Sequence, residues 1–267
     1  MPSTSAPAGP SPSEPTGTAP GGTVAAGIYF AGDTPQGVRL YREFQRVDAG
    51  DRLLAAANLA VQGAPVDPDY RTLWPEGAEI AAVSFDGVGA DGLVQVGIGD
   101  PALHDRPPGM TEREASLAIQ QVVYTLQGAV GARAPVQFLL DGNPVDTVLG
   151  VPTAEPLAND PQLDVLSLVN ITAPEEGATV RGDTLEISGV ASSFEATVPV
   201  ELRRGDTVVR TGFATAEGWQ DRLYPWRTTL DVSGLPPGAY TVVARTDDPS
   251  GGEGPGPYVD TKAVTLG

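Results

Sequence analysis

The residue types that most often carry out catalysis are scarce in this chain. The sequence has no cysteine and one histidine, His104, which lies in the loop-like segment DPALHDRPPG. A catalytic triad or a histidine-based metal site would have to use His104, and no Gly-x-Ser-x-Gly sequence accompanies it. Without cysteine there is no disulfide, no thiolate metal site and no cysteine nucleophile. We therefore expect His104 to be a solvated loop residue.

Three glycines match the G-x-G-x-x-G spacing of dinucleotide-binding loops: Gly87, Gly89 and Gly92. Such a site requires a helix to begin at the loop, so that its backbone N–H groups meet the pyrophosphate. The residues that follow, LVQVGI, alternate as a strand does, so we interpret GVGADG as a hairpin loop. The single lysine, Lys262, follows no glycine-rich loop, which excludes a phosphate-binding loop.

Carboxylate pairs are the remaining candidates for acid–base chemistry or calcium binding. Glycosidases hold two carboxylates about 5 to 10 Å apart in a cleft. The acidic pairs of this chain lie in predicted turns, where carboxylates are usually solvated, and none matches the D-x-D-x-D-G calcium loop. We expect no catalytic residue, no cofactor and no metal, and we keep a carboxylate-based hydrolase as the minor alternative. The pairs are Glu175 with Glu176, Asp247 with Asp248, and Asp86 with Asp91.

The aromatic residues are the best candidates for a contact with a partner. In EGWQDRLYPWRTTL, Tyr224 and Trp226 share one face of a predicted strand, and Trp219 follows a turn glycine. Aromatic rings on a β-sandwich can form a platform that stacks on sugars or a hot spot that binds protein. The alternative, which we favour for each ring, is that it fills the core of a sandwich without a disulfide. We also expect Phe194, at the start of a strand, to lie in the core.

The composition excludes several classes of partner. Acidic residues outnumber basic ones by 34 to 16, for a formal net charge of −18. Such a surface repels phosphate backbones and anionic headgroups, so we expect no nucleic acid and no direct membrane contact. No apolar run approaches the roughly 18 residues that span a bilayer. The preference for Arg, Ala, Gly, Pro and Val is typical of a GC-rich bacterial genome.

Residues 1–23 are dominated by Pro, Ser, Thr, Ala and Gly. Such a segment cannot bury enough apolar surface to offset the entropy lost on ordering, so we predict a disordered stalk. It lacks the charged and apolar regions of a signal peptide. We expect it to follow a cleaved signal or a lipid anchor, with an ordinary disordered terminus as the alternative.

Residues 24–149 predict an α+β domain. Apolar and polar residues alternate in strands, and two segments have helical spacing. Thr111 and Glu114 form a T-x-x-E capping box, the clearest helix start in the sequence. The order predicts two helices on one face of a small mixed sheet. The predicted strands are 24–30, 38–47, 78–85, 93–98 and 136–141, and the helices begin after Asp51 and Thr111.

The rest of the chain predicts a linker and an all-β domain. Residues 150–166 are rich in Pro, Asn and Asp, which is typical of a linker. Residues 167–267 contain seven short runs of β-prone residues separated by turn signals, the pattern of an immunoglobulin-like sandwich.

The two domains resemble a known pairing in bacterial envelope lipoproteins. RLYREFQRV, LWPEGAEIAAVSFDG, QQVVYTLQ and VQFLLDGNPV resemble a GerMN domain of the sporulation and germination type. VNITAPEEGATVRGDTLEISGVASSFEATVPVELR and LPPGAYTVVARTDDPSGGEG resemble Gmad2, an immunoglobulin-like module. Trp74 departs from the family, which usually has a smaller apolar residue there. Together the two resemblances cover nearly all of the chain after the stalk.

The resemblance implies an accessory module of the envelope without an established catalytic centre. We therefore expect a non-catalytic, extracytoplasmic protein, secreted or lipid-anchored, that acts as a scaffold or binds a protein partner or itself. The alternative is a protein that binds cell-wall glycan through Trp219, Tyr224 and Trp226. Any membrane association would depend on an N-terminal anchor that is absent from this sequence.

Overall fold

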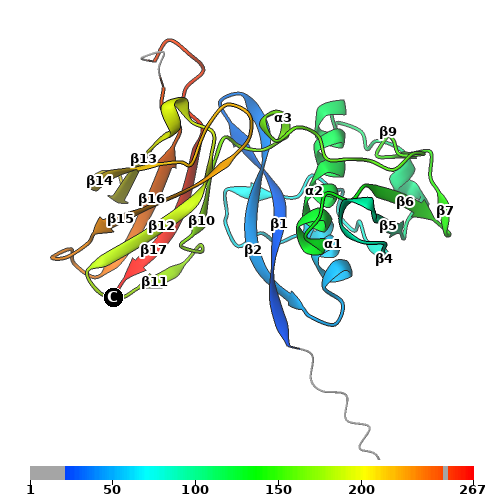
Figure 1. Cartoon of the computed structure of the whole chain (residues 1–267), viewed down its shortest axis with the longest axis horizontal. Helices are drawn as coiled ribbons and strands as arrows, with labels where there is room; N and C mark the ends of the chain where they lie inside the picture. The colour runs from blue at the N-terminus through cyan, green and yellow to red at the C-terminus, as the bar shows by residue number, and fades with distance from the viewer. Residues whose placement is uncertain (1–21, 249–251) are drawn as a thin grey trace, which may run out of the picture.

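The computed structural model describes residues 22–248 and 252–267, so the predicted stalk lies outside these ranges except for Gly22 and Thr23. An α+β domain and a β-sandwich lie side by side, with the long β1–β2 hairpin between them (Figure 1). The predicted fold class is confirmed.

The strands of the first domain form two main sheets rather than the single sheet that we predicted. Strands β1 and β2 pair along their whole length, and β3 adds to the other edge of β1. The second sheet has the order β4-β5-β6-β7 and is mixed, because β5 and β6 are parallel while the other pairs are antiparallel. The bounds are β1 Thr23–Thr34, β2 Gly37–Asp48, β3 Tyr70–Arg71, β4 Ile80–Asp86, β5 Leu93–Ile98, β6 Val136–Leu140, β7 Asn143–Pro144, β8 Thr147–Val148 and β9 Val151–Pro152.

Two helices separate these sheets, α1 (Arg52–Gln62) and α2 (Glu112–Val130) (Figure 1). The apolar stripe of α2 packs on the mixed sheet, as predicted. The polar residues on its other side are also buried: Gln121 donates to the carbonyl of Tyr29 in β1, and the Thr125 hydroxyl accepts from the Tyr29 N–H at 3.0 Å. Because these side chains satisfy the free backbone groups of β1, the hairpin docks on the helices and does not join the second sheet.

The helix starts differ in how they are capped. The predicted capping box of α2 is present, with the Thr111 hydroxyl accepting from the Glu114 N–H and the Glu114 carboxylate accepting from the Thr111 N–H. Asp51 stands at the N-cap of α1 but makes no side-chain capping bond. The start of α2 is therefore the better anchored of the two.

The segment 150–166, expected to be a linker, lies along the first domain. Leu157 exchanges two backbone hydrogen bonds with Val136 of β6. The Tyr124 hydroxyl of α2 donates to the carbonyl of Asp160, and a short helix follows, α3 (Gln162–Val165). These bonds hold residues 150–166 against the first domain, and we call this segment the strap.

The second domain is a sandwich of a three-stranded sheet, β10-β12-β15, and a five-stranded sheet, β11-β17-β16-β13-β14. The seven predicted runs are all strands, and the structure adds the short β11, which pairs in parallel with β17. One apolar cluster fills the space between the sheets. The bounds are β10 Val169–Ala173, β11 Ala178–Val180, β12 Thr184–Ala191, β13 Thr197–Arg204, β14 Thr207–Thr215, β15 Tyr224–Asp231, β16 Gly238–Arg245 and β17 Val259–Leu266.

The last strand carries the contact that fixes the two domains. Along β17, Val264 and Leu266 face the sandwich core, and the same face continues with Asp260 and Lys262. Both of these charged side chains are buried, at 3 % exposure. The alternation thus brings two opposite charges to the end of the core that meets the first domain.

The first domain supplies the partners of these charges from the segment before and within β3. The Lys262 ammonium forms a buried ion pair with Asp67 and donates to the Tyr70 hydroxyl at 2.9 Å. The Tyr70 hydroxyl in turn donates to the Asp260 carboxylate at 2.6 Å. We call Asp67, Tyr70, Asn170, Asp260 and Lys262 the interdomain polar cluster.

Other contacts complete the cluster. Asn170 in β10 donates to the Asp260 carboxylate at 3.1 Å, and the backbone N–H of Ile171 donates to the same oxygen. The ring of Tyr70 stacks on that of Tyr41, with ring centroids 4.9 Å apart, and the Tyr41 hydroxyl donates to the carbonyl of Val259. Charges buried with this many hydrogen bonds require one relative placement of the two domains.

Burial governs the ionisation of the cluster. Removal from water raises the pKa of Asp260 to about 6, against the opposing effect of the Lys262 charge and the hydrogen bonds from Tyr70 and Ile171. The pKa of Tyr70 lies well above its ordinary value, chiefly because of burial and then because of the Asp260 charge. Tyr70 therefore stays a neutral hydrogen-bond donor.

We predict that Lys262→Met destabilises the protein by about 3 to 5 kcal/mol at pH 8, because it leaves two buried carboxylates without their cation. Urea unfolding followed by circular dichroism measures the change. The double variant Lys262→Met with Asp67→Asn removes both charges of the ion pair and should recover much of the loss. Equal destabilisation by the single and double variants would contradict this account.

A matched control is the exposed ion pair of Arg71 and Asp33, whose nitrogen and oxygen lie 2.8 Å apart. Both side chains are well exposed to solvent. Arg71→Met should therefore cost less than about 1 kcal/mol. A loss as large as that of Lys262→Met would show that burial is not what makes the interdomain ion pair important.

We further predict a pH dependence that comes from Asp260. A carboxyl whose pKa is raised in the folded protein stabilises it fully below its unfolded pKa, about 3.9, and this stabilisation is lost as the pH rises through about 6. Relative to Asp260→Asn, the wild-type protein should therefore lose stability between pH 4 and pH 7. Unfolding free energies of both proteins across this range give the difference, and a constant difference would refute the prediction.

Candidate functional site

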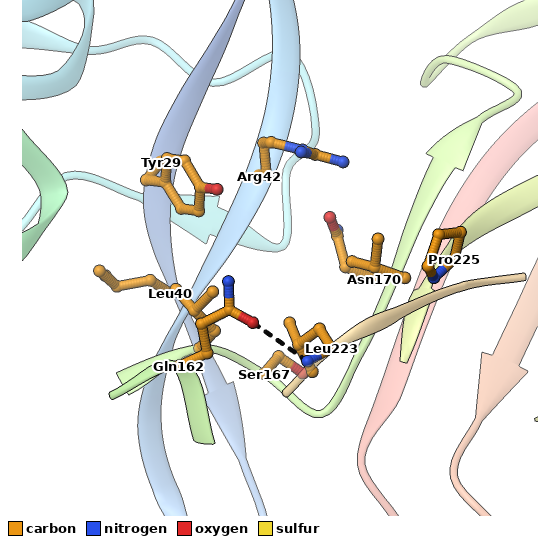
Figure 2. Close-up of a pocket in the computed structure, with 10 residues that line it drawn as sticks. Tyr29, Leu40, Arg42, Gln162, Ser167, Asn170, Leu223 and Pro225 are labelled. Atoms are coloured by element: carbon orange, nitrogen blue, oxygen red, sulfur yellow. Dashed lines mark hydrogen bonds between the residues drawn. The ribbon is translucent and has the colours of Figure 1, made fainter. Parts of the chain in front are cut away.

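A cavity of about 210 Å³ lies where the hairpin, α3 and the sandwich meet. Its wall combines residues of both domains, and neither domain alone forms it (Figure 2). The lining residues are Tyr29, Leu40, Arg42, Gln162, Leu166, Ser167, Asn170, Val190, Leu223 and Pro225. We call this space the interdomain cavity.

Arg42 projects from β2 beside this cavity, next to its cross-strand neighbour Tyr29. Its guanidinium donates to the Thr172 hydroxyl at 3.3 Å and lies over the ring of Phe44, 4.9 Å from the ring centroid. Its Nε atom is buried without a hydrogen-bond partner, and among the described residues Arg42 forms no ion pair. The arginine therefore retains an unused Nε donor and a charge without a direct ion-pair contact at the cavity wall.

Asn170 forms the opposite wall and belongs to the interdomain polar cluster. Its side chain is 3 % exposed, its amide nitrogen donates to the Asp260 carboxylate, and its Oδ1 atom has no hydrogen-bond partner. The ionised carboxylate of Asp260 can only accept hydrogen bonds. Asn170 must therefore turn its amide nitrogen toward Asp260, which leaves its carbonyl oxygen as the group without a partner. Figure 2 shows Tyr29, Arg42 and Asn170 extending into the space between the hairpin and the sandwich.

Gln162 closes the lower side of the cavity. This first residue of α3 accepts a hydrogen bond at its Oε1 atom from the N–H of Leu223, which comes just before β15 of the second domain. The bond orients the amide so that its nitrogen is on the cavity side (Figure 2). The Gln162 amide nitrogen thus adds a further donor to the wall.

A second hollow, of about 270 Å³, begins on the other side of Tyr29 and Arg42. It is lined by Tyr124 and Arg133 among others, and the Arg133 guanidinium lies 5.4 Å from the centroid of the Tyr124 ring. No Asp or Glu is among the described residues that line this hollow or the interdomain cavity. Acidic side chains do line two other hollows that Arg42 borders: Glu43, Glu175 and Glu176 in a smaller one, and Glu217 in one that it shares with Val190 and Pro225.

The three aromatic residues that we predicted as a partner or glycan contact differ in their burial. Trp226 is 3 % exposed and packs in the sandwich core on the same strand face as Leu230, so it is not available as a surface platform. Trp226 is buried because this face of β15 is the core face of the sandwich, which has no disulfide and depends on apolar packing. Trp219 and Tyr224 are half-buried at the edge of the same cluster.

These two remaining rings have close neighbours. Trp219 meets Phe194 edge to face, with ring centroids 5.2 Å apart, and the Arg222 guanidinium lies 4.7 Å from the centroid of the Tyr224 ring. Phe194, which we expected in the core, is 38 % exposed. It lies in a short 3-10 turn (Phe194–Ala196) before β13, which moves it off the strand face.

The other sequence candidates lie in exposed positions. His104 ends the 3-10 turn Pro101–His104, is half-exposed, and contacts the carboxylate of Asp105 at 3.2 Å. GVGADG connects the antiparallel strands β4 and β5, so the hairpin-loop interpretation is confirmed. Within residues 22–248 and 252–267, no group of three His, Asp or Glu side chains is arranged to hold a metal ion.

Sequence reasoning did not identify Arg42, Asn170 or the interdomain polar cluster. One signal was present: the only lysine stands two residues before Val264 and two after Asp260, on the core face of a predicted strand. A charge at a core-facing position is a reason to look for a buried partner. No sequence signal of this kind marked Asn170. The residues on both sides of it in β10 are also buried, so this strand lacks the alternation that would assign Asn170 to one face.

Two protein families match this chain. The family described as "Sporulation and spore germination" matches residues 27–146. The family described as "Immunoglobulin-like domain of bacterial spore germination" matches residues 168–253. No helix in the described part of the chain is long and apolar enough to cross a membrane.

Solved structures show more distant likeness. The tandem GerMN domains of the sporulation protein GerM from Bacillus subtilis are 17 % identical, with a TM-score of 0.41 over 80 % of this chain and 63 % of that one. An engineered protein is also 17 % identical, with a TM-score of 0.30 over 57 % of this chain and 36 % of that one. The chain thus spans less than two thirds of either structure. No curated protein matches.

The family matches agree with the order of domains in the structure, in which an α+β unit precedes an immunoglobulin-like sandwich. Neither family description names a catalytic activity. The chain contains a GerMN-type domain of the sporulation and spore germination family followed by a Gmad2 immunoglobulin-like domain.

Proposed function

We propose that this protein is a non-catalytic module of the bacterial cell envelope that binds a protein partner at the interdomain cavity and its neighbouring hollow. The observation that supports this most is the composite wall, to which the first domain contributes an arginine without an ion pair among the described residues and the second domain contributes the free Asn170 oxygen. A surface that exists only when two domains are fixed together is suited to recognition, since its donors are already oriented.

The chemistry of the cavity supports binding over catalysis. Its polar groups are one arginine, a tyrosine, two amides and a serine, Ser167. General acid–base catalysis at neutral pH usually needs a His, Asp, Glu or Lys side chain close to the substrate. None is among the described residues that line the cavity.

The proposed location is outside the cytoplasm, as a secreted or lipid-anchored protein. The sporulation and germination families support it, because those processes involve the cell envelope. The acidic composition, with a net charge of −18, agrees with a protein that does not bind nucleic acid or anionic lipid directly. Partner binding and self-assembly are both compatible with this location.

A second candidate function is binding of cell-wall glycan, now through Trp219 and Tyr224 without Trp226. The observation in its favour is that Trp219, Tyr224 and Phe194 are partly exposed at one end of the sandwich. Partly exposed rings can stack on the apolar faces of sugars.

Photo-crosslinking in the host cell tests the partner proposal. A photoreactive phenylalanine analogue at Leu223, in the cavity wall, should yield a crosslinked product of higher mass, and Arg42→Glu should abolish it. The control position is Val88, which is 85 % exposed at the β4–β5 loop and should yield no such product. Arg46→Glu, a charge reversal on the same strand, should leave the product unchanged. The absence of a crosslink at Leu223, or equal crosslinking at Val88, would refute the proposal.

A sedimentation assay with insoluble peptidoglycan tests the glycan alternative. If the rings stack on sugars, the wild-type protein sediments with the wall material, and replacing both Trp219 and Tyr224 with Ala reduces the bound fraction at least tenfold. Phe213→Ala serves as a control, because this ring is 67 % exposed elsewhere on the sandwich. Failure of the wild-type protein to sediment would exclude this function.

A further inference from the structure

We infer that the interdomain cavity binds the C-terminal end of a peptide chain, with its carboxylate at Arg42 and its last N–H group directed toward Asn170. This inference rests on the proposed function and specifies the chemistry of the partner. It follows from the charge, the unused hydrogen-bonding groups and the size of the cavity.

The charge of the cavity opposes that of the rest of the protein. Acidic residues outnumber basic ones by 34 to 16 in the chain. The interdomain cavity and the hollow beside it nevertheless contain Arg42 and Arg133 and, among their described lining residues, no carboxylate. The field of a charge beside low-dielectric walls concentrates in such a concavity, so an anion is attracted there.

The donors at the wall are those that a carboxylate requires. Arg42 forms no ion pair among the described residues and has a buried Nε atom without a partner, the Tyr29 hydroxyl extends toward the cavity, and Gln162 presents its amide nitrogen. Arginine binds carboxylates with short, charge-assisted hydrogen bonds, often in pairs. These hydrogen bonds gain strength in a half-enclosed site of lower dielectric.

Asn170 adds a requirement that a simple anion does not meet. Its Oδ1 atom is a buried acceptor without a partner, at the wall across from Arg42. A buried acceptor that is left without a hydrogen bond destabilises the structure, so a ligand that brings a donor is favoured. A C-terminal residue carries its backbone N–H close to its carboxylate and therefore supplies both groups.

The size of the cavity agrees with a single terminal residue. Its volume of about 210 Å³ is large enough for a terminal residue with a small side chain. The apolar part of the wall includes Leu40, Leu223 and Pro225, which can contact a small side chain or the preceding residue. A free carboxylate such as acetate would fill only part of this space.

Calorimetric titration of the full chain with trialanine tests the inference, and amidated trialanine is the matched control. Both peptides have the same backbone N–H groups, and amidation replaces the charged terminal carboxylate with a neutral carboxamide. We expect trialanine to bind at least tenfold more tightly than its amide and at least tenfold more tightly than sodium acetate. Equal affinity for acid and amide would overturn the carboxylate assignment, and equal affinity for acetate would overturn the peptide assignment.

Two variants locate the site. Arg42→Gln should weaken trialanine binding at least tenfold, whereas Arg46→Gln, on the same strand, should not change it. Because Arg42 contacts Phe44 and Thr172, its replacement could affect folding, so Tyr29→Phe, which removes only one hydroxyl, is the second test and should weaken binding about threefold or more. Unchanged affinity in both variants would overturn the inference. If the Leu223 crosslink depends on Arg42 while acid and amide peptides bind equally, only this inference fails and the proposed function stands.

Discussion

The buried ion pair between Lys262 and Asp67 is the contact on which the arrangement of this protein depends. Desolvation of two charges usually costs about as much as their attraction returns, so such a pair contributes little net stability. Its effect is on geometry, because any other placement of the domains would leave a buried charge without its partner. The chain therefore uses its only lysine to orient two domains.

The interdomain cavity follows from this placement. Asn170 binds Asp260 within the polar cluster, and its free oxygen faces the cavity on the other side. Arg42 comes from the hairpin of the first domain, and Gln162 comes from the strap that runs between the domains. A shift of the sandwich would separate Asn170 from Arg42, so the cavity and the polar cluster are features of one interface.

Much of the fold could be predicted from local sequence patterns. Alternation marked the seven strands of the sandwich, and the Thr111 capping box marked α2. The division of the first domain into two sheets could not be predicted, since it depends on Gln121 and Thr125 of α2 satisfying the edge of β1 across more than 90 residues of sequence. Spacing along one helix gives no information about which strand its polar side meets.

The site was harder to predict than the fold. The aromatic pattern in β15 identified a strand face correctly, but burial decided that Trp226 belongs to the core. Arg42 and Asn170 lie 128 positions apart, on different domains, and meet only because the interdomain polar cluster fixes both. Arginine and asparagine are ordinary residue types in a strand, so only their tertiary contacts reveal the role of Arg42 and Asn170.

The measurement that tests this account most directly is the distance distribution between spin labels on the two domains. The chain has no cysteine, so cysteines introduced at the exposed positions Gln62 and Thr229 would be the only labelled sites. The account predicts one narrow distribution for the wild-type background and a broad one for Lys262→Met at pH 8. A broad distribution in the wild-type background, or an equally narrow one after loss of the lysine, would contradict the claim that the buried ion pair fixes the domains.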